Sequence, residues 1–168
     1  MHTQHVLQAL AREISTTATG QALFRSLAKG VANALAVDYV FVGECSPAGT
    51  SSGRAPMPCA ERLEVFCVHG QEAEETPCGR VGYLFEVLEG RAFRTIPAGV
   101  QKLFPHNPFF QTLDVDGYAG VSLLDEAGAV TGLLSVMHRG PLPDVAAAEG
   151  ILAIAAKRAE GELVRARL

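Results

Sequence analysis

Two short segments of this chain are apolar on both of their alternating faces, and this feature constrains its fold more than any other. They are residues 39–45 (YVFVGEC) and residues 62–69 (RLEVFCVH), which are rich in β-branched and aromatic residues and bounded by Pro, Gly and Ser. Successive side chains of a strand point to opposite faces, so a strand that is apolar on both belongs to a sheet covered on both sides. We therefore expect a sheet between two layers of other structure.

Helical spacing of apolar residues at the two ends of the chain predicts one covering layer. Residues 3–14 and 20–36 each carry one apolar stripe, and Thr19 is a plausible N-cap for the second helix. Asp144 can cap a last helix, which meets no Gly or Pro stop before residue 168, so we expect the natural helix to continue further. The apolar face of this last helix consists of Ala148, Ile151, Leu152, Ala155, Ala159 and Leu163.

The middle of the chain is irregular and rich in phenylalanine. Its pattern predicts short helices over residues 79–90, 99–104 and 107–113 and a short strand over residues 92–96. Five of the eight phenylalanines lie in this stretch. Irregular backbone with so many aromatic side chains must fold over an apolar surface, and the second face of the sheet is the simplest candidate.

A hairpin follows the irregular stretch. Residues 117–124 (GYAGVSLL) and 130–138 (VTGLLSVMH) flank a turn that ends in Gly128. The order of helix, two strands, irregular segment, hairpin and long helix predicts an α+β domain.

Composition excludes several classes of protein. The chain has 168 residues, of which 48% are hydrophobic, and a net charge of −4, so it is neither disordered nor equipped with the basic surface that nucleic acid requires. It shows no signal peptide and no apolar run long enough to cross a membrane. Four cysteines are too few for a disulfide scaffold, so we expect a cytoplasmic protein with reduced thiols.

Three segments, in order, resemble the GAF family. The stretch GYAGVSLLDEAGAVTGLLSVMHRGPL is similar to the terminal GAF hairpin. ETPC at residues 75–78 resembles the G-T-P-C segment of one GAF subset, although Glu75 stands where Gly is usual. GVQKLFPHNPFFQTL is similar to the F-P-x-x-P segment that the same subset carries, with His106 and Asn107 where acidic residues are common.

The resemblance implies a GAF/PAS-like antiparallel sheet of five or six strands, with terminal helices on one face and a small-molecule pocket under irregular segments on the other. The whole chain would be one domain: N-terminal helices over residues 3–36, sheet and pocket over 39–142, and a signalling helix over 144–168. Bacterial GAF domains of this kind often precede PAS, histidine-kinase or diguanylate-cyclase (GGDEF) modules. The expected role is sensory, without catalytic activity, and the ligand is not identified.

The candidate ligand-binding residues are mostly aromatic, as an apolar site with few polar groups requires. They are Phe41, Phe66, Cys78, Tyr83, Phe93, Phe104, Phe109, Tyr118 and Met137. Polar groups expected nearby are Thr76, His106, Asn107, Ser122, Ser135 and His138.

The alternative to a domain that senses by binding a small molecule is one that uses thiol chemistry. It would be either a redox sensor or an enzyme that resembles the free methionine sulfoxide reductases built on the same fold. Cys45 and Cys67 fall inside strands and are expected to be structural, whereas Cys59 and Cys78 are the better redox candidates. The Cys-His dipeptide of bilin-binding GAF domains is absent. Cys67 and His69 form the only close Cys/His pair, without the further ligands that a metal site needs.

The terminal helices also predict assembly. Their apolar stripes favour helix packing between two copies, so we expect a homodimer in which the helices carry the signal onward. The residues assigned to this contact are Leu7, Leu10, Ile14, Ile151, Leu152, Ala155, Ala159 and Leu163. A scaffold whose pocket is filled by its own side chains, and which serves only to dimerise, is a third possibility.

Overall fold

The computed structural model describes residues 20–44, 64–73 and 82–167. Its elements, in chain order, are α2 (Gly20–Leu35), β1 (Tyr39–Glu44), β2 (Glu64–Val68), β3 (Gln71–Glu72), α3 (Gly82–Leu88), β4 (Phe93–Ile96), α4 (Val100–Leu103), α5 (Pro108–Leu113), β5 (Gly117–Leu124), β6 (Val130–His138) and α6 (Val145–Arg167). The expected helix over residues 3–14 lies outside the described residues.

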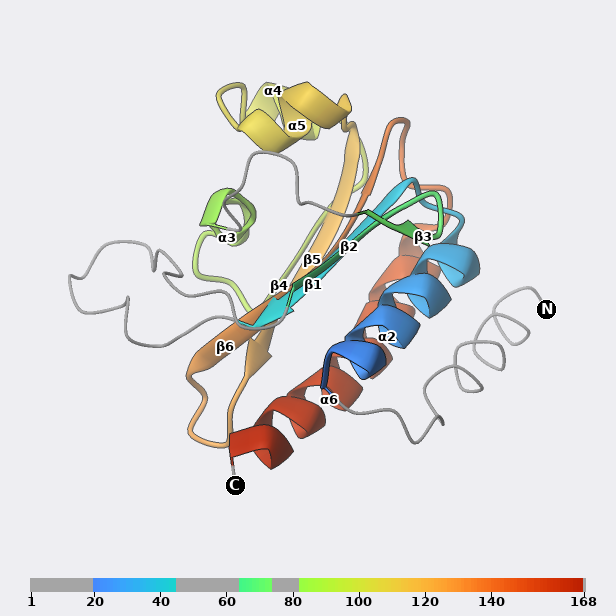
Figure 1. Cartoon of the computed structure of the whole chain (residues 1–168). Helices are drawn as coiled ribbons and strands as arrows, with labels where there is room; N and C mark the ends of the chain where they lie inside the picture. The colour runs from blue at the N-terminus through green and yellow to red at the C-terminus, as the bar shows by residue number, and fades with distance from the viewer. Residues whose placement is uncertain (1–19, 45–63, 74–81, 168) are drawn as a thin grey trace.

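The described strands form one antiparallel sheet in the order β3-β2-β1-β6-β5-β4. Helices α2 and α6 lie side by side on one face, which we call the first face (Figure 1). Helices α3, α4 and α5 lie on the opposite side of the sheet, which we call the second face (Figure 1). The expected α+β architecture, with a sheet covered on both sides, is confirmed.

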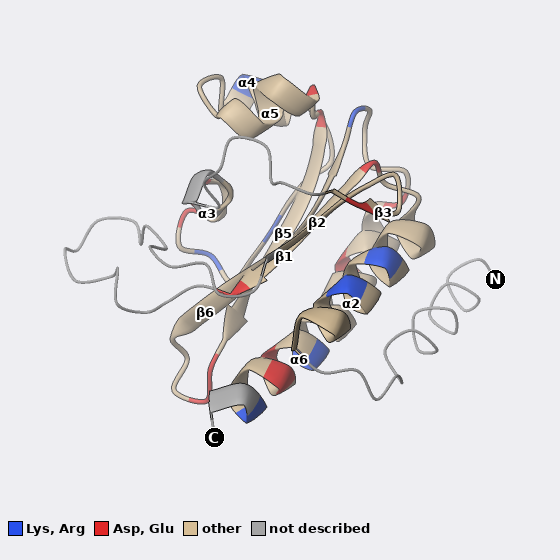
Figure 2. Ribbon diagram, in the orientation of Figure 1, with Lys and Arg blue, Asp and Glu red and all other residues tan. Residues whose placement is uncertain are grey.

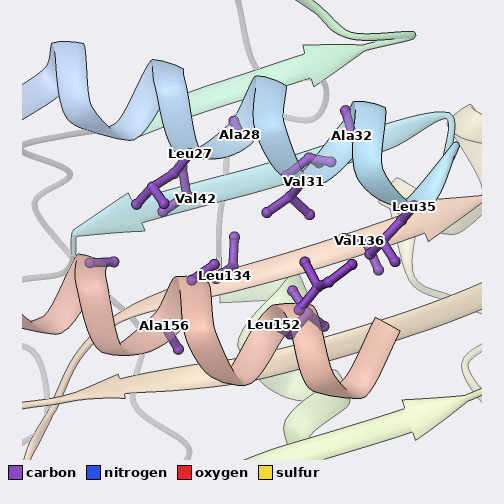
Figure 3. Packing of buried hydrophobic residues seen from close by; sticks show 14 of the residues in the cluster. Leu27, Ala28, Val31, Ala32, Leu35, Val42, Leu134, Val136, Leu152 and Ala156 are labelled. Atoms are coloured by element: carbon purple, nitrogen blue, oxygen red, sulfur yellow. The ribbon is translucent and has the colours of Figure 1, made fainter. Parts of the chain in front are cut away.

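The first face is packed with aliphatic side chains. Leu27 and Val31 of α2 meet Val42 of β1, while Leu152 of α6 lies over Leu134 and Val136 of β6 (Figure 3). All of these side chains are buried. Apolar residues spaced three and four apart on each helix therefore cover the side chains that alternate strand positions point toward them.

Polar groups fix both ends of α6. The Asp144 carboxylate accepts a hydrogen bond from the Ala147 N–H (3.0 Å), as expected of an N-cap residue. Near the other end, the buried Glu162 accepts from the Gly20 N–H at the start of α2 (2.8 Å) and pairs with Arg165 (2.6 Å). The bond between Glu162 and the Gly20 N–H ties the two long helices to each other.

The apolar stripe of α6 packs against other residues of the same chain. Ile151, Leu152, Ala155 and Ala159 are completely buried and Leu163 is 1% exposed, all within the first-face cluster. Their assignment to a dimer contact is therefore wrong, because the sheet needs the whole stripe. Leu7, Leu10 and Ile14, the other residues assigned to this contact, lie outside the described residues, so the homodimer stays a prediction.

The hairpin has the predicted bounds, and its turn is held by Asp125. The Asp125 carboxylate accepts from the N–H groups of Ala127 (2.9 Å) and Ala129 (2.8 Å), and Gly128 adopts a φ of 84°. Two features around β2 differ from expectation. The strand ends at Val68, because His69 turns into the left-handed region with a φ of 49°, and the chain then adds the short strand β3.

No helix in the described part of the chain combines the length and the apolar character that crossing a membrane requires.

Candidate functional site

The second face carries an apolar cluster that is much richer in aromatic residues than the first. Its buried members, which we call the second-face cluster, are Tyr39, Phe41, Phe66, Leu84, Val87, Leu88, Ile96, Val100, Phe109, Phe110, Val115, Tyr118, Leu133 and Met137. They come from five strands, from all three short helices and from the segment before β5.

Short helices α4 and α5 bring phenylalanine rings onto the sheet. Asn107 caps α5, since its side-chain oxygen accepts from the Phe109 N–H (3.0 Å), and Pro108 occupies the first helical position, where its missing N–H costs nothing. The Phe110 ring then meets the Tyr118 ring edge-on at 5.8 Å, and the Phe104 ring meets Phe110 at 6.3 Å. The capping of α5 therefore places the Phe110 ring against Tyr118 of β5.

One cross-strand row runs across the middle of the second face. Arg94 on β4 pairs with Gly120 on β5, Gly120 pairs with Ser135 on β6, and Ser135 pairs with Phe41 on β1, which pairs with Phe66 on β2. Side chains at directly paired positions lie on the same face, about 5 Å apart at Cβ. The row thus begins with a cation, passes a glycine and a hydroxyl, and ends in two aromatic rings.

The Tyr118 hydroxyl lies over the glycine of this row. A Cβ atom built on Gly120 would overlap the Tyr118 hydroxyl oxygen and would lie 2.7 Å from the ring carbon that bears it. Tyr118 and Gly120 are two residues apart on β5 and so share a face. The missing side chain at residue 120 makes room for the phenol, which brings its oxygen next to the position of Ser135.

Two hydroxyls at this place are buried without a hydrogen-bond partner. Among the described residues, the unpartnered buried side-chain oxygens are those of Tyr118, Ser135 and Thr95, and the first two lie on the second face. Burial raises the pKa of the Tyr118 phenol well above its usual range, and the charge of Arg94 opposes this effect only in part. Tyr118 therefore remains a protonated hydrogen-bond donor at any physiological pH.

Arg94 connects the sheet to the short helices. Its Nη1 donates to the carbonyl of Val87 in α3 (2.9 Å) and lies 3.2 Å from the carboxylate of Glu89. Its guanidinium also lies 5.3 Å from the centre of the Phe104 ring. The side chain is only 14% exposed, and Arg94 is the only Lys or Arg in the six described strands. Figure 2 shows how few charges the strands carry.

The structure brings most of the predicted site residues together. Phe41, Phe66, Phe109, Tyr118 and Met137 belong to the second-face cluster, and Phe104 packs against it. Cys78 lies outside the described residues, and so does the side chain of Tyr83, whose backbone is part of α3.

The assignment of Phe93 to this site is wrong. Phe93 packs against the first-face cluster, because it is three residues from Ile96 on β4 and an odd separation along a strand changes the face. Arg94 takes the second-face position instead. The sequence signal for Arg94 is a single charged residue inside a short predicted strand, since the fold must accommodate its side chain.

The described cysteine and its neighbouring histidine do not form a reactive pair. Cys67 is buried in the first-face cluster, and burial, aided by the charge of Glu72, raises the pKa of its thiol to about 11. Such a thiol carries little thiolate at neutral pH. His69 lies beyond the end of β2, mostly exposed, with its Nδ1 3.2 Å from Asp38. Cys45, Cys59 and Cys78 lie outside the described residues.

A polar cluster at one end of the sheet was not foreseen. The Asp38 carboxylate lies between the Nδ1 atoms of His69 (3.2 Å) and His138 (3.3 Å) and accepts from the Arg139 N–H (3.0 Å). The Arg139 Nε donates to the Tyr39 hydroxyl (2.9 Å), which in turn donates to the Leu113 carbonyl at the end of α5 (3.1 Å). The segment that leads to α6 is thereby joined to the second-face cluster.

Comparison with known proteins identifies the fold. No family model matches the chain. No curated protein matches it either. Among solved structures, free methionine-R-sulfoxide reductase from Neisseria meningitidis, in complex with its substrate, matches with a TM-score of 0.67 and 12% identity over 99% of this chain and 92% of that one.

Two further structures agree. The GAF domain of an Acinetobacter phosphoenolpyruvate-protein phosphotransferase matches with a TM-score of 0.63 and 16% identity over 98% of this chain and 94% of that one. A far-red absorbing protein in its dark state, with bound biliverdin, matches with a TM-score of 0.61 and 14% identity over all of both chains. This chain has the fold of a GAF domain.

Proposed function

We propose that this chain is a sensory domain that binds a small molecule on the second face of its sheet and passes the binding event to an output module through α6. The observation that carries the proposal is the pair of buried hydroxyls of Tyr118 and Ser135, which have no partner among the described residues. Burying such a group without a hydrogen bond costs about 1–3 kcal/mol, and a bound polar group would remove that cost.

A short route leads from the second face to α6. The Tyr39 hydroxyl joins the Leu113 carbonyl of α5 to the Arg139 side chain, as described above. The Leu142 N–H donates to the Pro97 carbonyl, between β4 and α4 (2.9 Å). The residues just before α6 are therefore bonded to Pro97 ahead of α4 and linked through the Tyr39 hydroxyl to Leu113 at the end of α5. Displacement of residues 97–113 by a ligand would reach α6 through these two connections.

Native mass spectrometry of the purified protein tests the binding half of the proposal. We expect a population heavier than the chain alone, from which a small molecule is released on denaturation. Hydrogen exchange on the as-purified and the emptied, refolded protein then tests the transmission half. Loss of the molecule is expected to speed exchange over residues 93–113 and 139–148. A spectrum with the bare chain mass only, together with unchanged exchange, would contradict the proposal.

A conservative variant separates binding from transmission. Tyr39→Phe removes one oxygen and with it the link between Leu113 and Arg139. We expect the variant to retain the bound mass, while the difference in exchange over residues 139–148 becomes smaller. Equal differences in the variant and the unmodified protein would show that the signal takes another path.

A thiol-based function is the second candidate, and the match to the Neisseria reductase favours it. The chemistry would fall to Cys45, Cys59 and Cys78, because Cys67 is buried with a raised pKa. The test is turnover of free methionine sulfoxide with a thiol reductant. Turnover that survives Cys67→Ser and disappears when the other three cysteines are replaced by Ser would establish the enzyme. Absence of turnover in the unmodified protein leaves the sensor as the function.

A further inference from the structure

We infer that the ligand of the second face is an organic anion, whose carboxylate is held by Arg94 with hydrogen bonds from Tyr118 and Ser135. This inference rests on the proposed sensory function and names the chemical class of its ligand. It also assigns a recognition role to three residues that otherwise have an unfavourable or unexplained placement.

The three groups lie at neighbouring positions of the sheet. Arg94 and Ser135 are paired with Gly120 from its two sides, and the Tyr118 hydroxyl lies over Gly120 itself. Cross-strand neighbours are about 5 Å apart, and a carboxylate spans about half that distance between its oxygens, so one carboxylate can receive hydrogen bonds from more than one of these residues. The rest of the row is apolar and places Phe41 and Phe66 beside the same spot.

Arg94 has donors to spare. A guanidinium carries five N–H donors, and the contacts of Arg94 with Val87 and Glu89 both use Nη1. Within the described residues, Nε and Nη2 make no hydrogen bond or ion pair. The contact with Glu89, whose side chain is 52% exposed, shows that the guanidinium already attracts a carboxylate at the rim. A ligand carboxylate on the inner side would form the same bond away from solvent.

The donor set favours an anion, and a carboxylate in particular. Tyr118 and Ser135 offer O–H donors, and the raised pKa of Tyr118 keeps its proton in place. A planar guanidinium matches a planar carboxylate in geometry, and beside Glu89 a ligand with one negative charge leaves less charge uncompensated in an apolar setting than a phosphate dianion would. The aromatic neighbours fit an apolar or aromatic body attached to the carboxylate.

A ligand can reach these three residues only if α3 and Phe104, which cover them, move. The Tyr118 and Ser135 oxygens are shielded from solvent, and Arg94 is bonded to α3 and stacked against Phe104. Because Arg94 both recognises the ligand and holds these covering groups, binding would rearrange its contacts with Val87 and Phe104. Recognition and displacement of the cover are then one event.

Benzoate and benzamide form the probe pair for the test, since they have the same shape and only benzoate is charged. We expect benzoate at high concentration to raise the melting temperature of the emptied protein in a saturable manner, as a ligand of the native state does, and benzamide to have little effect. Arg94→Gln should weaken benzoate binding by about tenfold or more, as expected when a charged hydrogen bond is lost.

Tyr118→Phe and Ser135→Ala provide a readout that a structural role would not produce. Each should weaken benzoate binding and at the same time raise the melting temperature of the empty protein, because each removes a buried hydroxyl without a partner. Thr95→Val is the matched control, since it removes an unpartnered buried hydroxyl from the opposite face of β4. It should raise the melting temperature and leave the benzoate response unchanged.

Equal responses to benzoate and benzamide, or no response to either, would overturn the inference. So would benzoate binding that is unchanged in Arg94→Gln and Tyr118→Phe. If the purified protein still carries a neutral small molecule under those conditions, the proposed sensory function stands and only the ligand class is wrong. If it carries nothing and benzoate does not bind, both fail.

Discussion

The two faces of this sheet are covered in different ways. On the first face, two helices of 16 and 23 residues lay aliphatic side chains over the strands. On the second face, helices of 7, 4 and 6 residues carry aromatic side chains, and buried hydroxyls without partners lie beneath them.

This difference indicates which face stabilises the fold and which face can bind a ligand. Helices as short as α3, α4 and α5 do not persist without tertiary contacts, so their stability is local and low. We expect the long helices α2 and α6, with the aliphatic layer beneath them, to contribute most of the free energy of folding. We therefore expect the first face to hold the fold and the second face to open for a ligand, and the following substitutions test that division.

Introducing a charge on the first face should have the largest effect. Ala155 is fully buried under α6, so Ala155→Glu forces a carboxylate into an aliphatic layer and should lower the free energy of unfolding by more than about 3 kcal/mol. Ile154→Glu is the control, because the neighbouring side chain is 46% exposed. Urea denaturation measures both. A folded Ala155→Glu protein of normal stability would show that the first face is not the main source of stability.

Replacing a glycine by alanine should change the stability in opposite directions on the two sides of the sheet. Gly120→Ala places a carbon where the Tyr118 hydroxyl lies, and we expect a loss of about 2 kcal/mol from the overpacking. Gly150→Ala, on the exposed side of α6 with open space around it, should gain about 0.5–1 kcal/mol. The loss at residue 120 should shrink in a Tyr118→Phe background. Thermal melts of the unmodified protein, the two glycine variants, Tyr118→Phe and the Tyr118→Phe/Gly120→Ala double variant measure these effects.

Removing one helix cap from each face should separate local from global stability. Asp144→Ala and Asn107→Ala each lose a cap hydrogen bond worth about 1 kcal/mol. We expect Asp144→Ala to lower global stability, and Asn107→Ala mainly to speed hydrogen exchange within α5. Uniform acceleration across the sheet in Asn107→Ala would indicate that the second face unfolds only together with the first.

The smallest expected effect is on the stability of the protein at low pH. The hydrogen bonds from Arg165, and to a lesser extent from Gly20, hold the pKa of Glu162 below its usual value of 4.5. A carboxyl with a lowered pKa in the folded protein stabilises the fold above its ordinary pKa, and this stabilisation is lost as the pH falls through the folded value. Glu162→Gln should therefore flatten the decline of stability below about pH 4.5, whereas Glu149→Gln, on an exposed position of the same helix, controls for the loss of one charge.

Alternation and helical spacing were sufficient to predict the layers. The faces of β1 and β2 were assigned correctly from Phe41 and Phe66 against Val40 and Val65, and the hairpin strands have the predicted bounds. Local patterns of this kind depend only on neighbouring residues. They place a side chain on one face or the other wherever several apolar residues agree.

The site depended on relations that local patterns do not contain. Phe93 was misassigned because, in a four-residue strand, its hydrophobicity alone does not reveal which face it occupies. The row from Arg94 to Ser135 exists only through pairing between strands distant in sequence. The short strand β3 pairs through its backbone, and its residues, Gln71 and Glu72, are exposed and polar, so no hydrophobic signal marks it.

The strand order has a consequence for how the chain folds. β1 lies near the start of the sequence and β6 near its end, yet they pair at the centre of the sheet, from Tyr39 opposite Met137 to Glu44 opposite Gly132. During synthesis β1 and β2 must therefore wait, with one edge of β1 open, until β6 has left the ribosome. Folding should be slow for a protein of this size, and a chain cut before β6 should bind chaperones or aggregate, since the missing strand would leave both halves of the sheet without their common neighbour.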